Sequence, residues 1–543
     1  MTRIDRFHVL VIGSGGAGIR AALEAVKYGP VCIVSKTITG KGGCTVMAEG
    51  GINGVLNPAD STGSHFEDTM KGGAYLNDPK LVETLVTEAP DRIRELVSWG
   101  ACFEVTPENR LAQRPFGGQK FARTCYAGDR TGHELVMTLL EQLRGSDVEI
   151  RDETDVVRLI VHDNRVYGAV TVDYAGTVST ILADAVVLAT GGAGQIYPVT
   201  TNSTAGTGDG YALAYRAGAK LIDMEEVQFH PTGSVKPADS RGRLITEAVR
   251  GEGGILRNVN GDRFMQNYDA SRMELSTRDV VARAIATEVT NGNGTASGGV
   301  YLDVSHLPAA VIEDRLPVML SQFLQAGIDI RKQPMEVAPT AHHFMGGVAI
   351  TPDGQTSLDG LFAAGETAGG VHGGNRLGGN ALAETQVFGK RAGEVAGKSP
   401  VSEDGTEYAE AAVQEVETEL AAFSSGTAKP AAVRAELQQL MWNHVGIFRN
   451  ELDLRIAERE LKRLSSLKLK VTSPQKIIEA LCVRNMLTTA GLVVSGALLR
   501  RESRGAHTRT DITQKWTAEK SPYGHTWFIK EKAGIELREE YLQ

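Results

Sequence analysis

Glycine-rich segments near the N-terminus are the first residues whose types and spacing indicate chemistry. The segment GSGGAG at 13–18 follows an apolar run at 8–12 and precedes a helical pattern at 19–28. Glycines in such a turn let backbone N–H groups and a helix N-terminus approach a pyrophosphate. A second apolar run at 31–34 completes an order of strand, turn, helix and strand. This context predicts a dinucleotide-binding unit rather than a simple tight turn.

A second glycine-rich block, TITGKGGCTVMAEGG at 37–51, bears on the type of dinucleotide. Its glycine pairs follow the second strand and let main chain run beside a flat ring system, which suits a flavin better than a nicotinamide. The acidic residue that usually binds ribose at the end of that strand is absent, since Ser35 and Lys36 stand there. Glu366, after a late apolar run, could bind another cofactor hydroxyl, although a surface acid is the competing interpretation.

Histidine, threonine and arginine side chains form a second candidate set, of the types that bind carboxylates. His230 and Thr246 suit one carboxylate, and His342 with Arg376 suits another, because arginine makes charge-assisted bidentate pairs. Reducing a C=C bond between two carboxylates needs such groups at each end, a hydride source and an acid on the opposite face. A single histidine is more often structural, so only the whole set indicates such a site.

Several elements must position these residues. The apolar runs at 185–192 and 360–366 end in glycine and are expected to return to the first sheet. The intervening residues 225–339 resemble an insertion that forms a cap. After a polar linker at 398–406, few glycines and helical periodicity predict a bundle, with helices near 410–424, 430–442, 450–464 and 475–500.

The expected fold class is therefore α/β: a Rossmann-like, glutathione-reductase-type dinucleotide domain with an inserted α+β capping domain and a C-terminal helical bundle. The predicted boundaries are 1–224 and 340–397 for the FAD-binding domain, 225–339 for the cap, 407–500 for the helical domain and 501–543 for a C-terminal segment.

Composition excludes several classes of function. The chain has 543 residues, 42% of them hydrophobic, and a net charge of −9, which disfavours nucleic acid and anionic membranes as partners. Its apolar runs fall short of the ~20 residues of a membrane helix, and no signal peptide is visible, so we expect no membrane insertion and a cytoplasmic location. The five cysteines are scattered and never form a C-x-x-C pair, which predicts no metal or iron–sulfur site in this chain.

Ordered sequence motifs give a more specific resemblance. They are GSGGAG (13–18), GGCTVMAEGGIN (42–53), DRTGH (129–133), ATGG (189–192), TGDG (207–210), QFHPTG (228–233), LITEAVRGEGGIL (244–256), TRDVV (277–281), HHFMGG (342–347), GLFAAGE (360–366), HGGNRLGGNAL (372–382) and ESRGAH (502–507). In this order the chain resembles the flavoprotein subunits of the succinate dehydrogenase and fumarate reductase family, which also includes L-aspartate oxidase. The resemblance covers about residues 8 to 507.

The resemblance implies roles for individual residues. Arg278 would be the proton donor, with Glu247 and Arg250 as its relay, although an isolated i, i+3 ion pair is the alternative for the last two. His230, Thr246, His342, Arg376 and Phe116 would bind the substrate. The predicted residues around FAD are Gly13, Gly15, Gly16, Ala17, Gly18, Ser35, Lys36, Thr37, Gly42, Gly43, Cys44, Thr45, Gly50, Gly51, Ala189, Thr190, Gly191, Asp209, Glu366, Arg376, Asn380 and Leu382.

Two departures from the family pattern refine this expectation. Respiratory members hold FAD covalently through a histidine where this chain has Cys44, so we expect dissociable FAD and a preference for fumarate reduction, with a cysteine thioether as the alternative. In aspartate oxidases an acidic residue recognises the substrate amine at the position of Phe116. An apolar ring cannot pair with an ammonium group, which disfavours that activity.

The electron source is the remaining question. With no cluster ligands here, the family precedent favours an iron–sulfur partner subunit. The GGNRLGGNAL and MAEGG variants resemble archaeal and anaerobic members, including the fumarate reductase that oxidises coenzyme M and coenzyme B thiols, as in methanogens. The alternatives are a quinone-linked succinate dehydrogenase, located at the membrane through its partner subunits, and an electron-relay flavoprotein with a vestigial dicarboxylate site.

Overall fold

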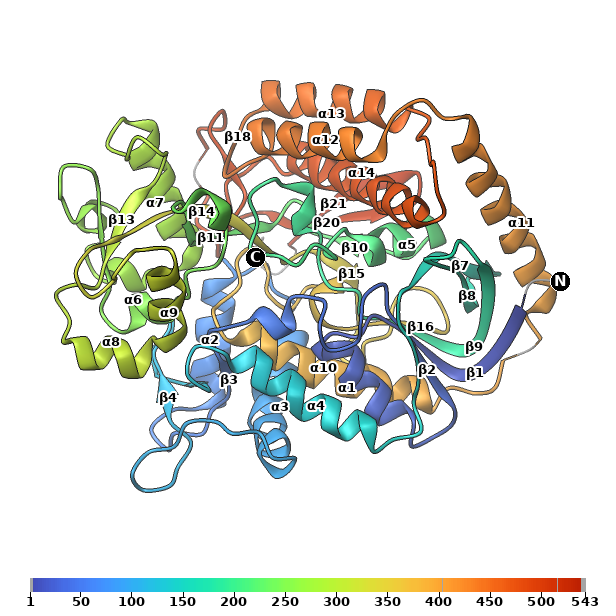
Figure 1. Ribbon diagram of the computed structural model, residues 1–543, viewed down its shortest axis with the longest axis horizontal. Coiled ribbons are helices and arrows are strands. Elements are labelled where there is room, and N and C mark those ends of the chain that lie inside the picture. The colour runs from blue at the N-terminus through green and yellow to red at the C-terminus, as the bar shows by residue number, and fades with distance from the viewer. Residues whose placement is uncertain (1–2, 403, 515, 539–543) are drawn as a thin grey trace.

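The computed structural model describes residues 3–402, 404–514 and 516–538. Its central sheet has the strand order β6-β2-β1-β9-β8-β7, with β16 also paired to β9 (Figure 1). Its strands are β1 Arg3–Ile12, β2 Val31–Val34, β6 Glu149–Arg151, β7 Thr154–His162, β8 Arg165–Asp173, β9 Val178–Leu188 and β16 Leu361–Ala363. Both β9 and β16 run parallel within this sheet, so the predicted return of the two late apolar runs is confirmed.

Strand β1 shows why the sheet is buried on both faces. Val9 and Val11 pack into one hydrophobic core, whereas Leu10 and Ile12 pack into another, as the two-residue period of a strand requires. The first core lies against helices α1 Gly16–Ala25, α3 Pro79–Ser98, α4 Thr131–Arg144 and α10 Asn380–Gly397. Continuous apolar runs are typical of such doubly covered parallel strands.

Helices α1 and α10 pack with their backbones close together. A Cβ atom added to Gly393 of α10 would lie 2.2 Å from the carbonyl oxygen of Ala21, and one added to Gly389 would lie 2.7 Å from that of Ala17. The four-residue spacing on each helix aligns these small residues on facing stripes. The contact therefore fixes the position of α1, whose N-terminus follows the glycine turn.

The cap has an antiparallel sheet and a hydrophobic core of its own, at the left of Figure 1. Its sheet has the order β11-β14-β13-β12. Its elements are β11 Val227–Ser234, α6 Ala248–Gly251, β12 Ile255–Arg257, α7 Arg278–Thr290, β13 Val300–Asp303, α8 Ala309–Arg315, α9 Pro317–Gln325 and β14 Met335–Phe344. The fold therefore includes the α+β capping domain that the sequence predicted.

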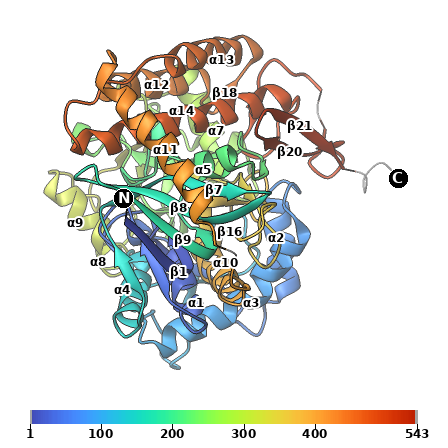
Figure 2. The same cartoon turned by 90° about the vertical axis from the view of Figure 1, so that its right-hand side faces the viewer.

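Four C-terminal helices extend the hydrophobic core on the second face of the central sheet. They are α11 Thr406–Ala422, α12 Pro430–His444, α13 Glu451–Ser465 and α14 Gln475–Leu499. Helix α11 crosses β7, β8 and β9 (Figure 2), whereas the other three pack on one another beside it. By length and composition alone α14 could cross a membrane, but 72% of its most apolar window is buried inside the protein. Such burial is typical of a core helix, which explains why α14 is apolar all round.

The segment after α14 returns to the FAD-binding part of the chain. Strand β20 Tyr523–Ile529 pairs with β10, and β21 Lys532–Leu537 follows it as a hairpin. The resulting five-stranded sheet, β17-β15-β10-β20-β21, is completed by β10 Leu221–Ile222, β15 Gly347–Ala349 and β17 Ala368–Gly369. The predicted C-terminal segment therefore adds strands to a sheet, and its residues 515 and 539–543 lie outside the described part of the chain.

The remaining elements are short or peripheral. They are α2 Thr62–Gly72, α5 Asp209–Ala217, the three-stranded sheet of β3 Ile52–Asn53, β4 Gln113–Arg114 and β5 Thr124–Cys125, and the pair β18 Phe448–Arg449 and β19 Thr508–Arg509.

Element boundaries differ modestly from the sequence expectation. The first helix begins three residues earlier than predicted and ends at Ala25, because Gly15 caps it directly after the turn. Strand β1 begins at Arg3, since its half-exposed first residues pair with β9. Residue 403 of the predicted linker lies outside the described residues. The domain boundaries themselves stay predictions.

Overpacking α1 against α10 is a test of this fold. We expect Gly393→Ala to lower the free energy of unfolding by about 1–3 kcal/mol, because its methyl group has no space between the helices. Gly491→Ala adds the same methyl to α14, where nothing lies within 4 Å, and should stabilise the protein by about 0.4–1 kcal/mol. Thermal unfolding measures both; equal melting temperatures would contradict the close contact.

Candidate active site

A cavity of about 830 Å³ lies where the C-terminal ends of β1, β2, β9 and β16 meet the cap. The predicted FAD residues that line it are Gly13, Gly15, Gly16, Ala17, Ser35, Lys36, Thr37, Gly42, Gly43, Cys44, Thr45, Gly50, Gly51, Ala189, Thr190, Gly191, Asp209, Glu366, Arg376 and Leu382. The predicted substrate and catalytic residues that line it are Phe116, His230, Thr246, Glu247, Arg278 and His342. The fold thus brings the two predicted sets into one space.

Three predicted residues stand outside the cavity wall. Gly18 lies behind the turn, where an added Cβ would be 1.9 Å from the carbonyl oxygen of Gly13. Asn380 donates to Thr69 and accepts from Asn53, so its side chain joins neighbouring loops. Arg250 is buried behind Glu247. Any contribution of these residues to the site is therefore indirect.

The sheet side of the cavity is a cradle of backbone. Gly15 is the N-cap of α1, so the first N–H groups of that helix begin at the wall, and that of Gly16 donates to Thr45 Oγ1 at 3.1 Å. Gly43 and Gly191 have φ of 85° and 74°, and an added Cβ would meet nothing within 4 Å at either position. Here the backbone conformation favours glycine, and the space beside it is open. This wall fits a dinucleotide with its pyrophosphate at the helix N-terminus.

A fixed ion pair stands at the end of β2. The Nζ atom of Lys36 donates to Asp209 Oδ2 at 2.5 Å and to Thr207 Oγ1 at 2.6 Å. Asn485 of α14 donates to the same carboxylate at 2.8 Å. Burial alone would lower the pKa of Lys36, but Asp209 raises it. The lysine is therefore a held cation at the position where other dinucleotide folds carry an acid.

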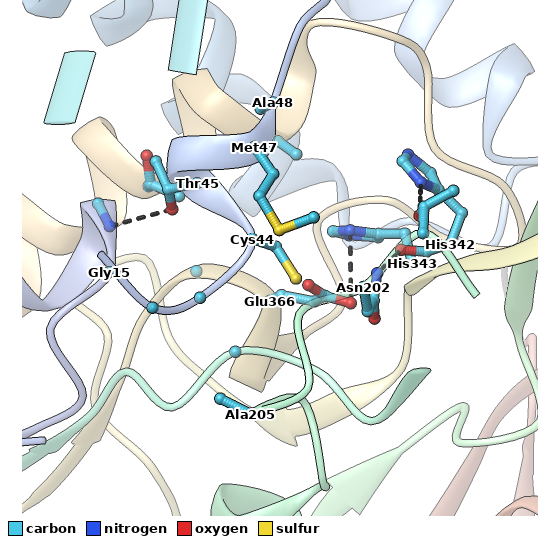
Figure 3. A pocket seen from close by; sticks show the side chains of 18 of the residues that line it. Gly15, Cys44, Thr45, Met47, Ala48, Asn202, Ala205, His342, His343 and Glu366 are labelled. Carbon is cyan, nitrogen blue, oxygen red and sulfur yellow. Dashed lines mark hydrogen bonds and ion pairs between the residues drawn. The ribbon is translucent and has the colours of Figure 1, made fainter. Parts of the chain in front are cut away.

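Cys44 and Glu366 face one another in the cavity (Figure 3). Burial raises the pKa of Glu366 to about 7, although the Phe344 N–H donates to its carboxylate at 3.0 Å. Burial and the nearby Glu366 together raise the pKa of the Cys44 thiol to about 12. At neutral pH the thiolate, which is the nucleophilic form, is therefore scarce.

His342 and Arg376 form a directly bonded pair. Arg376 Nη2 lies 2.9 Å from His342 Nε2, and because a guanidinium has no acceptor, this ring nitrogen must be unprotonated. The proton then sits on Nδ1, which lies 2.7 Å from Thr201 Oγ1. Burial lowers the pKa of His342 well below its usual range, as do the charges of Arg278 and Arg376. His342 is thus neutral, and its tautomer is set.

His230 faces His342 with ring centroids 5.0 Å apart. The backbone N–H of Thr232 donates to His230 Nδ1 at 3.3 Å, so the ring proton lies on Nε2. Burial and the charges of Arg278 and Arg250 lower the pKa of His230 well below its usual range. His230 is therefore a neutral donor, and Thr246, also buried, lines the same cavity.

Arg278 and Glu247 form a buried ion pair at the N-terminus of α7. Arg278 Nε and Nη2 both approach Glu247 Oε2, at 2.8 and 2.7 Å. Glu247 Oε1 accepts from the backbone N–H of Gly117 at 2.8 Å and lies 3.9 Å from Arg250 Nη2. Burial alone would raise the pKa of Glu247, but Arg278 and Arg250 lower it to about 2.

Phe116 is held rigidly at the cavity wall. Its ring is 2% exposed, and an added Cβ at Gly378 would lie 2.6 Å from it. A Cβ at Gly50 would lie 3.0 Å from Cε2 and Cζ of the same ring. The two glycines therefore leave the space that this ring occupies.

The ESRGAH segment at 502–507 contacts both arginine-bearing elements. Arg283, on the same helix as Arg278, donates to the carbonyl oxygen of Gly505 at 2.8 Å. Gly505 packs against Gly374, two residues before Arg376, and the Ala506 N–H donates to the Gly374 carbonyl at 2.7 Å. The C-terminal segment thus holds the cap helix and the Arg376 loop together.

Two of the site residues that were not predicted bear directly on its geometry. Thr201 accepts the Nδ1 proton of the His342 tautomer that Arg376 imposes. Gln228 contacts both Arg278 and Arg376. Gln228 lies two residues before His230 on β11, so strand alternation places both side chains on one face. The two-residue alternation of this strand could have identified Gln228 from the sequence. No sequence pattern identifies Thr201.

One group of side chains bears on the prediction that no metal binds. His343, His372 and Glu384 are buried, with potential ligand atoms within 4.8 Å of one another. His372 Nε2 is already bonded to Glu384 at 2.9 Å, and burial and the charge of Arg376 lower the pKa of His343. The positive field of Arg376 disfavours a cation here. The absence of a metal stays a prediction.

Comparisons with known proteins agree with this geometry. A family model described as FAD binding domain matches residues 8–382, and one described as fumarate reductase flavoprotein C-term matches 434–542. The chain is 53% identical to a subunit of the fumarate reductase (CoM/CoB) of Methanothermobacter marburgensis, covering 93% of this chain and 94% of that one. It is 40% identical to a fumarate reductase flavoprotein subunit of Mycobacterium tuberculosis, covering 98% and 96%.

A solved structure extends the similarity to the whole fold. The flavoprotein of Escherichia coli quinol fumarate reductase superposes with a TM-score of 0.92 at 34% identity, covering 99% of this chain and 96% of that one. The predicted fold class and FAD as the cofactor are therefore confirmed. The chain belongs to the fumarate reductase and succinate dehydrogenase flavoprotein family, whose members are FAD-dependent oxidoreductases acting on CH–CH groups.

Proposed function

We propose that this chain reduces fumarate to succinate as the flavoprotein subunit of a larger enzyme. The observation that carries the proposal is the convergence of two buried arginines, Arg278 and Arg376, and two neutral histidines on the cavity beside the FAD cradle. FAD, held by the glycine turns and Lys36, supplies a hydride when it is reduced. The chain's own residues bind and orient the dicarboxylate and deliver a proton.

The two carboxylates bind at opposite ends of the site. Arg376 and His342 take one of them, since an incoming carboxylate offers Arg376 a charge-assisted bond stronger than that to a neutral imidazole. His230, with its proton on Nε2, and the hydroxyl of Thr246 take the other. Phe116 supplies an apolar wall that presses on the substrate and twists one carboxylate out of conjugation.

Arg278 delivers the proton, and Glu247 with Arg250 replaces it. An arginine is an improbable acid because its pKa exceeds 12. The Glu247 carboxylate, bonded to Arg278 at 2.8 and 2.7 Å, is ionised at rest, so after each turnover it first takes up a proton and then passes it to the deprotonated Arg278. Arg250, 3.9 Å away on the far side of Glu247, supplies that proton and is itself reprotonated from solvent.

Two other activities fit the observations less well. An aspartate oxidase needs an acidic partner for the substrate ammonium group, whereas the wall at this position is the ring of Phe116. An electron-relay protein with a vestigial site would have no need of the bonded Arg278–Glu247 and Arg376–His342 pairs. Reducing the bound flavin until it bleaches and then adding fumarate distinguishes the two: fumarate reoxidises the flavin of a reductase but not that of an electron-relay protein.

Electrons reach the flavin through an iron–sulfur partner, ultimately from coenzyme M and coenzyme B thiols. The 53% identity to a subunit of an enzyme named fumarate reductase (CoM/CoB) supports this donor. A quinone-linked succinate dehydrogenase is the second candidate, favoured by the 40% identity to a Mycobacterium smegmatis Sdh1 structure with bound UQ1. A cytoplasmic location stays a prediction.

The raised pKa of Cys44 predicts that FAD is not covalently bound. Forming a thioether would require the thiolate, which is scarce when the thiol pKa is about 12. Acid precipitation should therefore release all the flavin into the supernatant. Fluorescence retained on the denatured polypeptide, and lost in Cys44→Ala, would show a cysteine link instead.

Arg278 and Arg376 should give different kinetic defects. Arg278→Ala should lower kcat by about 10²–10⁴-fold with FAD still bound, because the general acid is lost. Arg376→Ala should mainly weaken binding of fumarate and succinate, because a carboxylate clamp is lost. Viologen-linked turnover and flavin absorbance titrations measure the two effects, with the more exposed Arg257→Ala as control. Near-normal turnover of Arg278→Ala would exclude Arg278 as the donor, and His342 would be the next candidate.

The purified chain should use an artificial donor but not thiols. Reduced methyl viologen delivers electrons directly to flavin, whereas we predict no cluster ligands in this chain to accept them from coenzyme thiols. We expect fumarate reduction with viologen alone, and thiol-dependent turnover only after an iron–sulfur partner is added. Full thiol-dependent activity of the isolated chain would refute this division of labour.

A further inference from the structure

Gln228 is the one described side chain for which hydrogen bonds to both Arg278 and Arg376 are found. Its Oε1 atom accepts from Arg278 Nη1 at 3.2 Å and from Arg376 Nη2 at 3.3 Å. Its Nε2 atom donates to Asn375 Oδ1 and to the Arg376 carbonyl oxygen, each at 2.8 Å. The side chain is fully buried on β11.

The chemistry of the neighbours fixes the orientation of this amide. Guanidinium groups only donate hydrogen bonds, so the carboxamide oxygen must face the two arginines. The NH₂ group then faces the two oxygens, and all four hydrogen-bonding positions of the amide are used. Rotating the amide by half a turn would put donors against donors. Gln228 thus has a single satisfied orientation.

A neutral acceptor between two like charges has a specific consequence. The guanidinium groups repel each other in a buried site where water screens little. An amide oxygen draws both toward one point without cancelling either charge, so both remain free to attract an anion. A carboxylate at the same position would neutralise part of that charge, and an apolar side chain would leave the two groups without a common anchor.

We propose that Gln228 is a positioning residue that sets the spacing of Arg278 and Arg376 while preserving their charge. The inference rests on the proposed function, in which these arginines are the proton donor and the carboxylate clamp for one substrate. Gln228 itself acts through them. The separation of the two guanidinium groups then decides whether a dicarboxylate held by Arg376 has its double bond within reach of Arg278.

Two substitutions of similar volume distinguish an effect on the spacing of Arg278 and Arg376 from an effect on the charge of the site. Gln228→Met removes the acceptor but leaves both charges, so we expect kcat to fall by about tenfold or more while malonate affinity changes less than about threefold. Gln228→Glu keeps an acceptor but adds a negative charge, so we expect malonate affinity to fall by about tenfold to a hundredfold. Malonate is used because it is a dicarboxylate that cannot be reduced.

The experiment uses the FAD-loaded full chain. Viologen-linked turnover gives kcat and KM for fumarate, and the flavin absorbance change gives malonate affinity. Gln195→Glu is the matched control, since Gln195 is also buried, its oxygen also accepts from an arginine, Arg434, and its NH₂ group also donates to two oxygens, the carbonyls of Asn202 and Ser203. Gln195 itself does not line the cavity. FAD content and melting temperature identify a variant that is simply misfolded. If Gln228→Met loses FAD, the proposal is tested by the malonate affinity of Gln228→Glu alone.

Each outcome either supports or overturns the proposal. A loss mainly of kcat in Gln228→Met and mainly of malonate affinity in Gln228→Glu, with the control near wild type, supports it. Both variants within twofold of wild type, or equal losses of kcat and malonate affinity in both, overturn it while leaving fumarate reduction intact. A wild-type chain that binds no malonate and reduces no fumarate overturns the proposed function, and this inference with it.

Discussion

An excess of buried positive charge is the constraint on which the site depends. Arg250, Arg278 and Arg376 are each at most 7% exposed, and the carboxylate bonded among them is that of Glu247. Burying unpaired charge is costly, and neutral acceptors such as His342, Gln228 and the Glu274 carbonyl oxygen meet some of the remaining donors. Arg376 Nε and Arg250 Nε have no hydrogen-bond partner among the described residues. Under the proposed function, a bound dicarboxylate would supply the negative charge that these buried arginines lack. The residues whose burial is costly to the fold would then be the ones that recognise the substrate.

The neutrality of the histidines follows from the same charge. Burial and the arginines lower the pKa of His230 and His342 far below neutrality, so neither adds to the repulsion. Each then offers one donor and one acceptor, and its neighbours decide which nitrogen does which. The Arg376 guanidinium makes that choice for His342, and the Thr232 N–H makes it for His230. These contacts thus determine which hydrogen bonds a ligand finds.

Much of the fold could be predicted because its signals are local. The apolar runs that became β1, β2, β9 and β16 and the periodicity that became α11 to α14 depend on neighbours in the sequence. The pairing of β20 with β10 could not be predicted, since it joins residues about three hundred positions apart by a match of only two pairs. The residue types at the cavity were predictable from motifs, but the position of Arg250 behind Glu247 depends on the tertiary packing of the cap. Gln228 was missed because its contacts come from two arginines that only the fold brings to it from distant parts of the chain.

The contact of Gly505 with Gly374 and Arg283 has a consequence for synthesis of the chain on the ribosome. The central sheet that presents the FAD cradle is complete once β16 has been made, because its other strands precede residue 361. The segment that ties α7 to the Arg376 loop is translated more than a hundred residues later. N-terminal parts of a nascent chain generally fold first. The strands behind the dinucleotide cradle are therefore available before this tie is, and a chain interrupted ahead of residue 505 would lack the contacts that hold α7 to the Arg376 loop.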